Sequence, residues 1–455
     1  MPDDKFLSLL DQALPQLQQK FSSLPGFTPP AQTDVGDDPM AAVLTEVADR
    51  MADNFPYFHP LYAGQMMKPP HPIARAAYAM AMGINPNNHS LDGGRASSRC
   101  EVEAVAEIAA MFGWPQHLGH LTAGGTIANL EALWVAGQLH PGKKIVASAQ
   151  AHYTHSRISG VLGLRFSSIP VDRLGRMDME LLEQQLQRGD IGTVVATLGT
   201  TAIGSVDPLN RILALQPKYG FRIHVDAAYG GYFKLASNIS PEAVRNFQAA
   251  AQADSLVIDP HKHGLQPYGC GCVLFRDPAV GRFYKHDSPY TYFSSTDLHL
   301  GEITLECSRA GAAAVALWAT QRLLPLVLGG EFGRSLTQCR EAALQLSARL
   351  RNDPRFILPF DPELDILVWG TKASSVSEAS SLAQFIFDEA AKRNLHLALV
   401  QLPIALFPQE TWPDSASATN VTCLRSVLMK PEHLDWLDRI WDIFNMAASV
   451  ALPSR

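Results

Sequence analysis

Two short segments near the middle of the chain carry the side chains with the clearest chemical potential. Asp226 ends a strand-like run at 222–226, and Lys262 follows an apolar run at 255–259 within the sequence DPHKHG. A lysine amine can form a Schiff base with pyridoxal 5′-phosphate (PLP), and a carboxylate can keep the pyridine nitrogen of that cofactor protonated. The pair therefore predicts a PLP site in which the protonated ring acts as an electron sink.

A glycine-rich turn upstream supplies groups suited to the cofactor phosphate. Gly124, Gly125 and Thr126 stand directly before the helix-like sequence IANLEALW. Two glycines let the backbone approach an anion, and the N–H groups at a helix start attract negative charge. The Thr126 hydroxyl can cap the helix or donate to the phosphate. The turn predicts a phosphate-binding loop, while a glycine turn that simply opens a helix is the alternative.

Two small or polar residues flank Asp226. Ala228 would let a ring lie close against the backbone. His224 points to the same face of the strand as Asp226, because side chains alternate along a strand. His224 therefore either supports the aspartate or is a core histidine with other partners.

Eight segments of the chain resemble the group II PLP-dependent amino-acid decarboxylases, which include the aromatic amino-acid, tyrosine and glutamate decarboxylases. They occur in family order from about residue 58 to Arg309, with weaker traces to Arg425. The resemblance implies a fold type I PLP enzyme that works as a homodimer and converts an L-amino acid to its amine and CO2. The segments are FHPLYAG, NPNNHSLDGG, HLTAGGTIANLEALW, AQAHYTHSR, VVATLGTTAIGSVDP, HVDAAYGGYF, DPHKHG and LECSRAGAAA.

The resemblance also assigns roles around the cofactor. His152 in AQAHYTHSR matches the histidine that stacks on the pyridine ring and can shuttle protons, with His155 as the alternative. Thr201 is expected beside the ring hydroxyl, or else forms a strand-end turn. His261 is expected near the cofactor, and Arg309 near the phosphate or the dimer interface unless it is a structural ion-pair partner.

The substrate side is less well defined. The resemblance places Gln65 near the substrate carboxylate and brings Asn87 and His89 in from the partner subunit, so that the active site lies at the dimer interface. The segment that contains Asn87 and His89 is more polar here than in the aromatic decarboxylases. Arg95, just after it, stands where family members often have an uncharged residue. An arginine can bind an acidic side chain bidentately, or it can be solvated. An aromatic or an acidic substrate is therefore expected.

The sequence does not identify the residue that protonates the substrate carbon, so other outcomes than decarboxylation stay open. Family members carry a loop tyrosine that protonates the substrate carbon, and neither Tyr290 nor Tyr292 aligns clearly with it. An aminotransferase, an aldehyde synthase or a carbon–carbon lyase is the alternative to a decarboxylase. A catalytically idle PLP-binding protein is a third reading, which the intact set of Lys262, Asp226 and His152 opposes.

The elements that must position these residues have an α/β pattern. Short apolar runs alternate with helical stretches such as 126–139 and 208–219, which predicts a mainly parallel sheet with helices on both faces. The expected division is an N-terminal helical arm at 1–84, a large PLP-binding domain at 85–330 and a smaller C-terminal α+β domain at 331–455.

Composition narrows the class further. The chain has 455 residues, 18% of them charged, and a net charge of −7 without a basic block, so no nucleic acid is expected as a partner. No apolar run is long enough to span a bilayer, and the N-terminal sequence lacks the features of a signal peptide. Six scattered cysteines favour reduced thiols and a cytoplasmic location. Cys270 and Cys272 are too close for ordinary zinc spacing, so no metal is expected.

Overall fold

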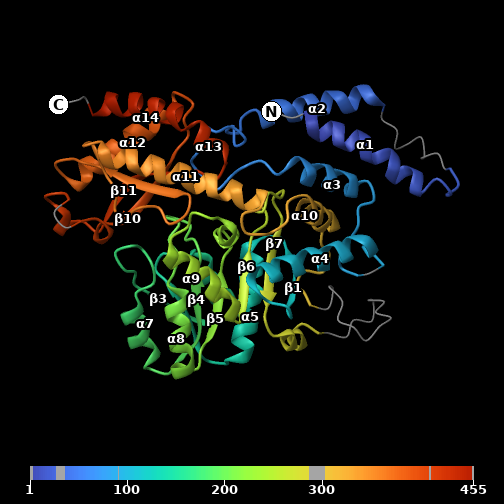
Figure 1. The fold of residues 1–455 in the computed structure, drawn as a ribbon, viewed down its shortest axis with the longest axis horizontal. Helices are drawn as coiled ribbons and strands as arrows, with labels where there is room; N and C mark the ends of the chain where they lie inside the picture. Colours follow the sequence, from blue (N-terminus) through green and yellow to red (C-terminus); the bar gives the residue numbers. More distant parts are fainter. Residues whose placement is uncertain (1–3, 27–35, 91, 286–302, 409–410, 453–455) are drawn as a thin grey trace.

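The computed structural model describes residues 4–26, 36–90, 92–285, 303–408 and 411–452. A seven-stranded sheet forms its centre, in the order β1-β7-β6-β5-β4-β2-β3 (Figure 1). Neighbouring strands are parallel except at β7, which is antiparallel to both β6 and β1. The predicted mainly parallel α/β sheet is therefore confirmed. Its strands are β1 (Leu118–Thr122), β2 (Lys144–Ser148), β3 (Arg165–Ile169), β4 (Ile191–Thr197), β5 (Arg222–Asp226), β6 (Ser255–Ile258) and β7 (Gly271–Phe275).

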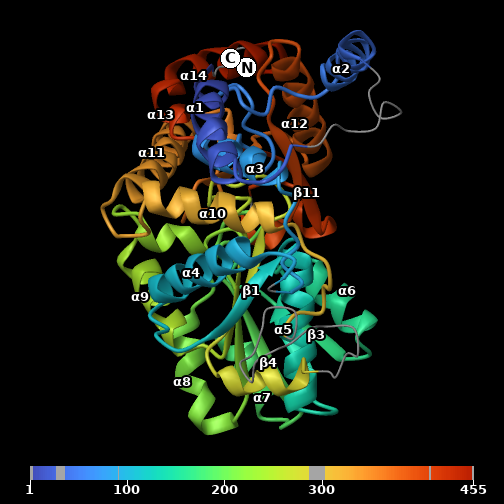
Figure 2. The ribbon, with the colours of Figure 1, turned by 90° about the vertical axis from the view of Figure 1, so that its right-hand side faces the viewer.

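Helices cover both faces of this sheet, as Figures 1 and 2 show. Successive residues of β4 point to opposite cores: Val194 packs in one cluster with α4 and α7–α9, whereas Val195 packs in another with α5 and α6. Every residue of β4 and β6 is buried, as expected for strands covered on both faces. The helices are α4 (Arg95–Phe112), α5 (Gly125–Leu139), α6 (Thr154–Val161), α7 (Met179–Leu186), α8 (Leu209–Tyr219) and α9 (Pro241–Ala249).

A second, smaller sheet lies toward the C-terminus. Its order is β10-β11-β9-β8, and every pair is antiparallel. Helices α11, α12 and α14 bury an apolar core against it. The two sheets lie inside the predicted ranges 85–330 and 331–455, whose boundaries stay a prediction. The elements are α11 (Glu331–Asn352), β8 (Phe356–Ile357), β9 (Ile366–Thr371), α12 (Val376–Ala391), β10 (Ala398–Pro403), β11 (Asn420–Val427), α13 (Glu432–Asp435) and α14 (Leu437–Ala451).

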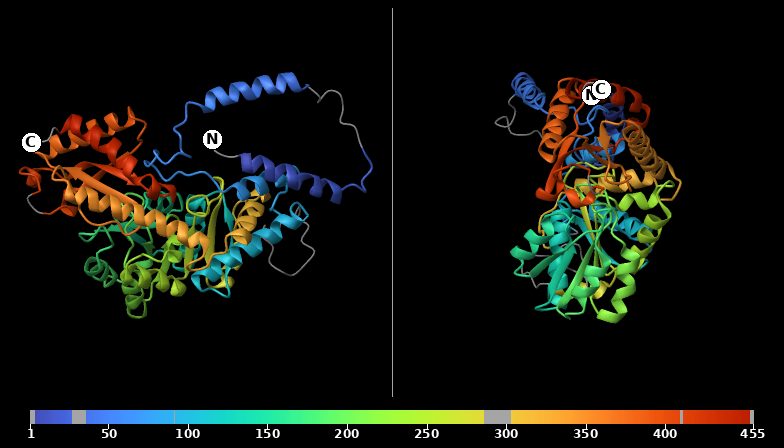
Figure 3. Two further views of the ribbon diagram at one scale, coloured as in Figure 1. Left: turned by 45° about the horizontal axis from the view of Figure 1, so that its top comes forward. Right: turned by 90° about the vertical axis from the view of Figure 1, so that its left-hand side faces the viewer.

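The N-terminal helices lie along one side of the molecule. α3 (Pro72–Met82) packs on α10 (Gly311–Leu323), and α1 (Asp4–Lys20) packs on α3. α2 (Asp37–Met51) has no buried residue and stands away from the body of the chain in Figure 3. None of the described helices is long and apolar enough to cross a membrane.

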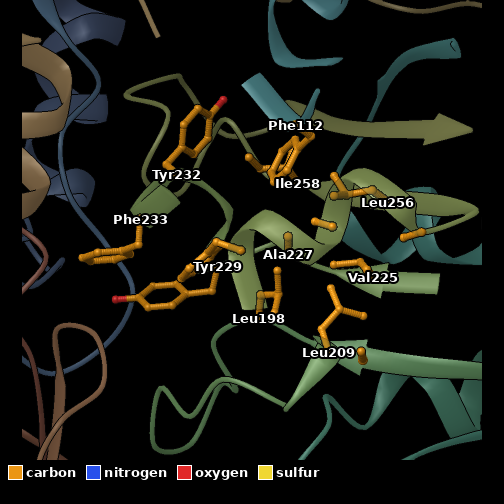
Figure 4. Close-up of a cluster of buried hydrophobic side chains, with 14 of the residues drawn as sticks. Phe112, Leu198, Leu209, Val225, Ala227, Tyr229, Tyr232, Phe233, Leu256 and Ile258 are labelled. Atoms are coloured by element: carbon orange, nitrogen blue, oxygen red, sulfur yellow. The ribbon is translucent and has the colours of Figure 1, made fainter. Parts of the chain in front are cut away.

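Short 3₁₀ segments complete the chain between these elements. They are η2 (Gly231–Leu235), η3 (Ala250–Gln252), η4 (Pro278–Phe283), η6 (Ile404–Leu406) and η7 (Ser415–Ser417). η2 follows β5 after a short turn and carries Tyr232 and Phe233 into the apolar cluster of Figure 4, which also contains Tyr229 and Leu198. This cluster lies behind the carboxyl ends of β4 and β5 and gives those strand ends a rigid support.

Candidate active site

A cavity of about 350 Å³ opens where β4, β5 and β6 end and α5 begins. The carboxyl ends of parallel strands share one edge of a sheet, which is the usual place for ligands in α/β folds. Residues from five separate segments meet there, including every residue predicted to bind the cofactor. The predicted residues in its lining are Gly124, Gly125, Thr126, His152, Thr201, Asp226, Ala228, His261 and Lys262.

Lys262 extends into this cavity from the turn after β6. Its Nζ lies 3.0 Å from Oδ2 of Asp259, which is the first residue after that strand and is buried. The other Asp259 oxygen, Oδ1, has no hydrogen-bond partner in the part of the chain that the structure describes. Asp259 also lines the cavity, and the sequence analysis did not predict it as a site residue. Its position in DPHK, three residues before the lysine, was the available signal.

Asp226, the last residue of β5, accepts two hydrogen bonds. Oδ2 accepts from Nε2 of His155 at 2.8 Å, and Oδ1 accepts from the backbone N–H of Ala228 at 3.1 Å. Burial alone raises the pKa of Asp226, but the hydrogen bond from His155 and the charge of Lys262 outweigh it and hold that pKa well below its usual range. The site therefore keeps a buried, charged carboxylate at the cavity wall.

His224 does not contact this carboxylate. Its Nδ1 lies 2.9 Å from Oγ of Ser255, and its Nε2 lies 2.8 Å from Oδ1 of Asn129. Burial lowers the pKa of His224 to about 3, so the ring is neutral. Of the two alternatives, His224 is the core histidine with other partners, and His155 supports Asp226 instead.

His152 sits at the start of the loop into α6 and lines the cavity. Its Nδ1 lies 2.8 Å from Oγ1 of Thr154 and also accepts from the Thr154 backbone N–H at 3.4 Å. Burial lowers the pKa of His152. A neutral ring whose Nδ1 accepts a hydrogen bond carries its proton on Nε2. His152 can therefore exchange a proton at that nitrogen.

The glycine loop leaves room that a side chain would fill. A Cβ on Gly125 would lie 2.6 Å from Oδ2 of Asp259, and one on Gly124 would lie 3.2 Å from Cε1 of His261. Gly124 has φ +156°, a conformation that other residues rarely adopt. Gly125 begins α5, whose first N–H groups have no helical acceptor. These features fit an anion that approaches the backbone closely.

Gln65, Asn87 and His89, the predicted substrate residues, do not line the cavity within this chain. Asn87 is used locally: its Nδ2 donates to Ser308 Oγ at 3.1 Å, and its Oδ1 accepts from the backbone N–H of Arg309 at 3.0 Å. His89 is half-buried. Their predicted role in a partner's site stays a prediction.

Arg309 and Arg95 lie in different surroundings. Arg309 pairs with buried Glu101, its Nη1 lying 2.5 Å from Oε1, so it acts as a structural ion-pair partner within the chain. Arg95 is the first residue of α4 and is exposed, which agrees with the solvated alternative. Tyr290 and Tyr292, the candidate proton donors, lie outside the described residues.

Arg425 on β11 carries a charge without a close carboxylate. It is 4% exposed, and no ion pair between described residues includes it. Nη2 donates to the carbonyl of Thr201 at 2.7 Å, and Nη1 lies 3.3 Å from Oε1 of Gln65. Further bonds join Nε to Ala202 and Nη1 to Gly64. Arg425 thus ties Gln65 to a cavity residue, Thr201, and burial lowers its pKa.

The described residues contain no group of histidine, cysteine and carboxylate side chains suited to hold a metal ion. All six cysteines are free thiols. The cavity lining offers one lysine, two carboxylates, two histidines, several threonine hydroxyls and the backbone donors of the glycine loop. That donor set fits PLP, which needs an amine for its aldehyde, a carboxylate for its ring nitrogen and N–H groups for its phosphate.

Comparisons with known proteins agree with this fit. The model of the pyridoxal-dependent decarboxylase conserved domain matches residues 29–372. An L-tyrosine decarboxylase of Enterococcus faecium is 26% identical over 92% of this chain and 89% of its own length. A probable L-tyrosine/L-aspartate decarboxylase of Methanothermobacter thermautotrophicus is 27% identical over 69% of this chain and 84% of its own.

Solved structures share the fold at low sequence identity. Oryza sativa TDC with PLP and tryptamine superposes with a TM-score of 0.79 at 17% identity, and each chain is covered to 99%. Mouse CSAD superposes with a TM-score of 0.77 at 20% identity, covering 95% of this chain and 92% of that one. At this identity the likeness establishes the fold.

Proposed function

The chain belongs to the pyridoxal-dependent decarboxylase family, and from this we propose that it decarboxylates an L-amino acid with an aromatic or acidic side chain, tyrosine and aspartate being the first candidates. Its cofactor is pyridoxal phosphate, and its reaction is amino-acid decarboxylation. The substrate is the proposed part. The relatives named above act on tyrosine, or on tyrosine and aspartate, according to their names.

The residues of the cavity divide the work between them. Bound PLP supplies the electron sink that weakens the bond to the departing carboxyl group. Lys262 would hold its aldehyde, Asp226 its ring nitrogen, and Gly124, Gly125 and Thr126 its phosphate. Lys262 and Asp226 meet in one cavity from different strands, which is the observation that supports this assignment.

His152 is proposed to move the proton that replaces CO2. Its ring lines the cavity and carries its exchangeable proton on Nε2, because Nδ1 is engaged by Thr154. Asp259 holds the Lys262 ammonium at 3.0 Å and so orients the amine within the cavity. Thr201, Ala228 and His261 are proposed to shape the walls around the ring.

A substrate carboxylate is proposed to bind near Arg425 and Gln65. A buried arginine with only carbonyl and amide partners has an uncompensated charge, and burying such a charge is unfavourable. Hydrogen bonds to four described residues use four of its five N–H groups, so within the described part of the chain one donor is left for a ligand. An arriving carboxylate would supply both the acceptor and the opposite charge.

A homodimer with the site at its interface is part of the proposal. The apolar side chains of α2 form one stripe along the helix and are 45–66% exposed in a single chain. Such a stripe favours burial against another surface, and a second copy fits the family resemblance. The residues are Met40, Val43, Leu44, Val47 and Met51. A cytoplasmic location is proposed from the six free thiols.

The proposed function is tested by supplying PLP-loaded protein with each common L-amino acid. We expect one equivalent each of CO2 and amine from tyrosine or aspartate, without peroxide, ammonia or keto acid. Arg425→Gln should abolish turnover of aspartate alone if it binds the side-chain carboxylate, and of both substrates if it binds the carboxyl group next to the amine. CO2 accompanied by peroxide and ammonia would instead indicate an aldehyde synthase, and keto acid an aminotransferase.

A further inference from the structure

We propose that His155 is a positioning residue that fixes the Asp226 carboxylate, acting as a neutral ring with its proton on Nε2. The inference rests on the proposed role of Asp226. His155 is fully buried at the start of α6, and its Nε2 lies 2.8 Å from Oδ2 of Asp226, which ends β5. The two residues are 71 positions apart in sequence. The contact therefore joins two separate elements at the cavity wall.

The surroundings of the ring determine its protonation form. His155 Nδ1 is buried and has no hydrogen-bond partner within the described parts of the chain. A protonated ring would bury an N–H without an acceptor at that atom, which is unfavourable. A neutral ring with its proton on Nε2 leaves only a lone pair there and still donates to Asp226. In this neutral form His155 donates a hydrogen bond to Asp226 and takes none of the negative charge away from the Asp226 carboxylate.

The geometry also fixes where the charge points. Oδ2 is held by His155 and Oδ1 by the backbone N–H of Ala228, so the carboxylate has a donor on each oxygen. His224, whose ring centre lies 6.4 Å from that of His155, is engaged with Asn129 and Ser255 instead. Asp226 would rotate about its side-chain bonds if the His155 donor were lost. His155 is thus the side chain that sets the direction in which Asp226 presents its charge to the cavity.

If His155 only fills the core, the expected order of the leucine and glutamine variants is the opposite of the order expected for a positioning residue. Glutamine places an amide N–H at about the reach of Nε2, whereas leucine and methionine fill the space without a donor. If His155 only packs, leucine is well tolerated in this buried position and glutamine, with an unpaired amide, is harmful. If His155 positions Asp226, the order is reversed.

The experiment compares His155→Leu, His155→Met and His155→Gln, with melting temperatures of the cofactor-free proteins as the folding control. Hydrogen bonds to charged groups contribute about ten- to a hundredfold in an equilibrium, and we expect leucine to lower kcat and to raise the Kd for PLP by about tenfold or more. KM should change little. Glutamine should stay within about fivefold of the parent in both quantities.

A spectroscopic readout separates positioning from packing. A ring nitrogen held less firmly in its protonated form withdraws fewer electrons from the linkage to Lys262, so that linkage keeps its own proton to higher pH. The pH midpoint of the visible absorption change of the bound cofactor should therefore rise by at least about half a pH unit with leucine or methionine. It should stay near the parent value with glutamine.

A double-substitution cycle tests whether His155 acts through Asp226. In an Asp226→Ala background, His155→Leu should add less than about a twofold effect on the Kd for PLP, because the group that it positions is gone. An equal effect in both backgrounds, or leucine and methionine variants that match the parent, would overturn the inference. Near-normal kcat and cofactor affinity in Asp226→Ala alone would instead refute the proposed role of Asp226.

Discussion

Asp259 and Lys262 form an ion pair inside the cavity, with Oδ2 and Nζ 3.0 Å apart and the two residues three positions apart in the sequence. The pair presents the lysine amine next to the start of α5, where Gly125 packs directly against the Asp259 carboxylate. The ion pair thus keeps the Lys262 amine beside the predicted phosphate-binding loop. Lys262 is the lysine that lines the cavity among the described residues, which supports its proposed role in attaching the cofactor.

Borohydride reduction of the PLP-loaded protein should attach the cofactor to Lys262, as read by peptide mass spectrometry. Lys262→Ala should lower turnover by at least about a thousandfold, the scale seen when a covalent catalytic group is removed. Lys372→Ala, at an exposed position of the small domain, serves as the control and should be unchanged. Label on another lysine would show that the attachment site is elsewhere.

Asp226→Asn should reduce kcat by at least about a hundredfold, because buried electrostatic groups of this kind are worth several kcal/mol. The amide removes the negative charge beside the ring nitrogen while it keeps the size of the side chain. Steady-state turnover and cofactor content are measured together. Asp435→Asn at an exposed position is the matched control. Full activity with cofactor bound would mean that Asp226 only closes the turn after β5.

The sequence predicted the central architecture because its buried strands are continuous apolar runs. β5 was predicted with its observed bounds, and the helical stretches expected at 126–139 and 208–219 match α5 and α8 within one residue. β1 and β3 were not predicted from the sequence, because LGHLT and RFSSI contain glycine or several polar residues and form no continuous apolar run. β3 lies at the edge of the sheet and is partly exposed, so burial does not impose an apolar pattern on it.

Residues of the site could be predicted where a chemically reactive side chain lies at the end of a strand or just after it. Asp226 and Lys262 are such cases, since strand ends converge at one sheet edge. The contact between His155 and Asp226 depends on the start of α6 meeting the end of β5 in three dimensions, and that arrangement is not encoded in local periodicity. The same holds for Arg425, which reaches Thr201 and Gln65 from another sheet.

Gly125→Ala should weaken PLP binding by about tenfold or more, since a Cβ 2.6 Å from Oδ2 of Asp259 forces that carboxylate or α5 to shift. The matched control is Gly160→Ala in α6, where a Cβ would meet nothing within 4 Å. Alanine there should leave cofactor affinity unchanged and raise stability by about 0.5–1 kcal/mol. Kd is measured by fluorescence titration and stability by urea unfolding. Equal affinities of both variants would contradict the close approach at this loop.

Lys430→Met should alter the pH dependence of stability. Burial lowers the pKa of Lys430 to about 7, and its Nζ donates to the carbonyl of Tyr62 at 2.7 Å. Between pH 7 and the unfolded value near 10.5, the unfolded chain binds a proton that the folded chain does not. The folded state therefore gains stability as pH rises through this window, by up to about 1.4 kcal/mol per pH unit.

The methionine variant lacks this titration, so its free energy of unfolding should rise less than that of the parent from pH 7 to pH 9. At pH 7 it should be close to the parent, because the lost hydrogen bond of about 1 kcal/mol is offset by removal of a buried charge. Urea unfolding at both pH values and one protein concentration gives the comparison. Parallel slopes would show that Lys430 stays protonated in the fold.

Subunit mixing tests whether the active site crosses a dimer interface. His89 is half-buried, lies outside the cavity lining of its own chain and has an Nδ1 atom without a partner among the described residues. A disabling His89 variant and Lys262→Ala should each be inactive alone. In a mixed dimer built across the interface, one of the two sites carries neither lesion. Random exchange makes about half of the dimers hybrid, so activity should recover to about a quarter of the parent value.

The control uses Lys262→Ala mixed with Asp226→Asn, two lesions from the same cavity. If the site takes His89 from the partner but Lys262 and Asp226 from one chain, each hybrid of this control mixture carries one lesion in each of its two sites, so no activity should be recovered. A double variant with both Lys262→Ala and a His89 change, mixed in equal amount with the parent chain, should leave about a quarter of the parent activity if the site crosses the interface, because each hybrid then has one lesion in each site. It should leave about half if His89 and Lys262 serve one site within a chain. Exchange is verified with subunits of two masses. No recovery in the first mixture, with exchange verified, would mean that His89 and Lys262 serve the same site within one chain.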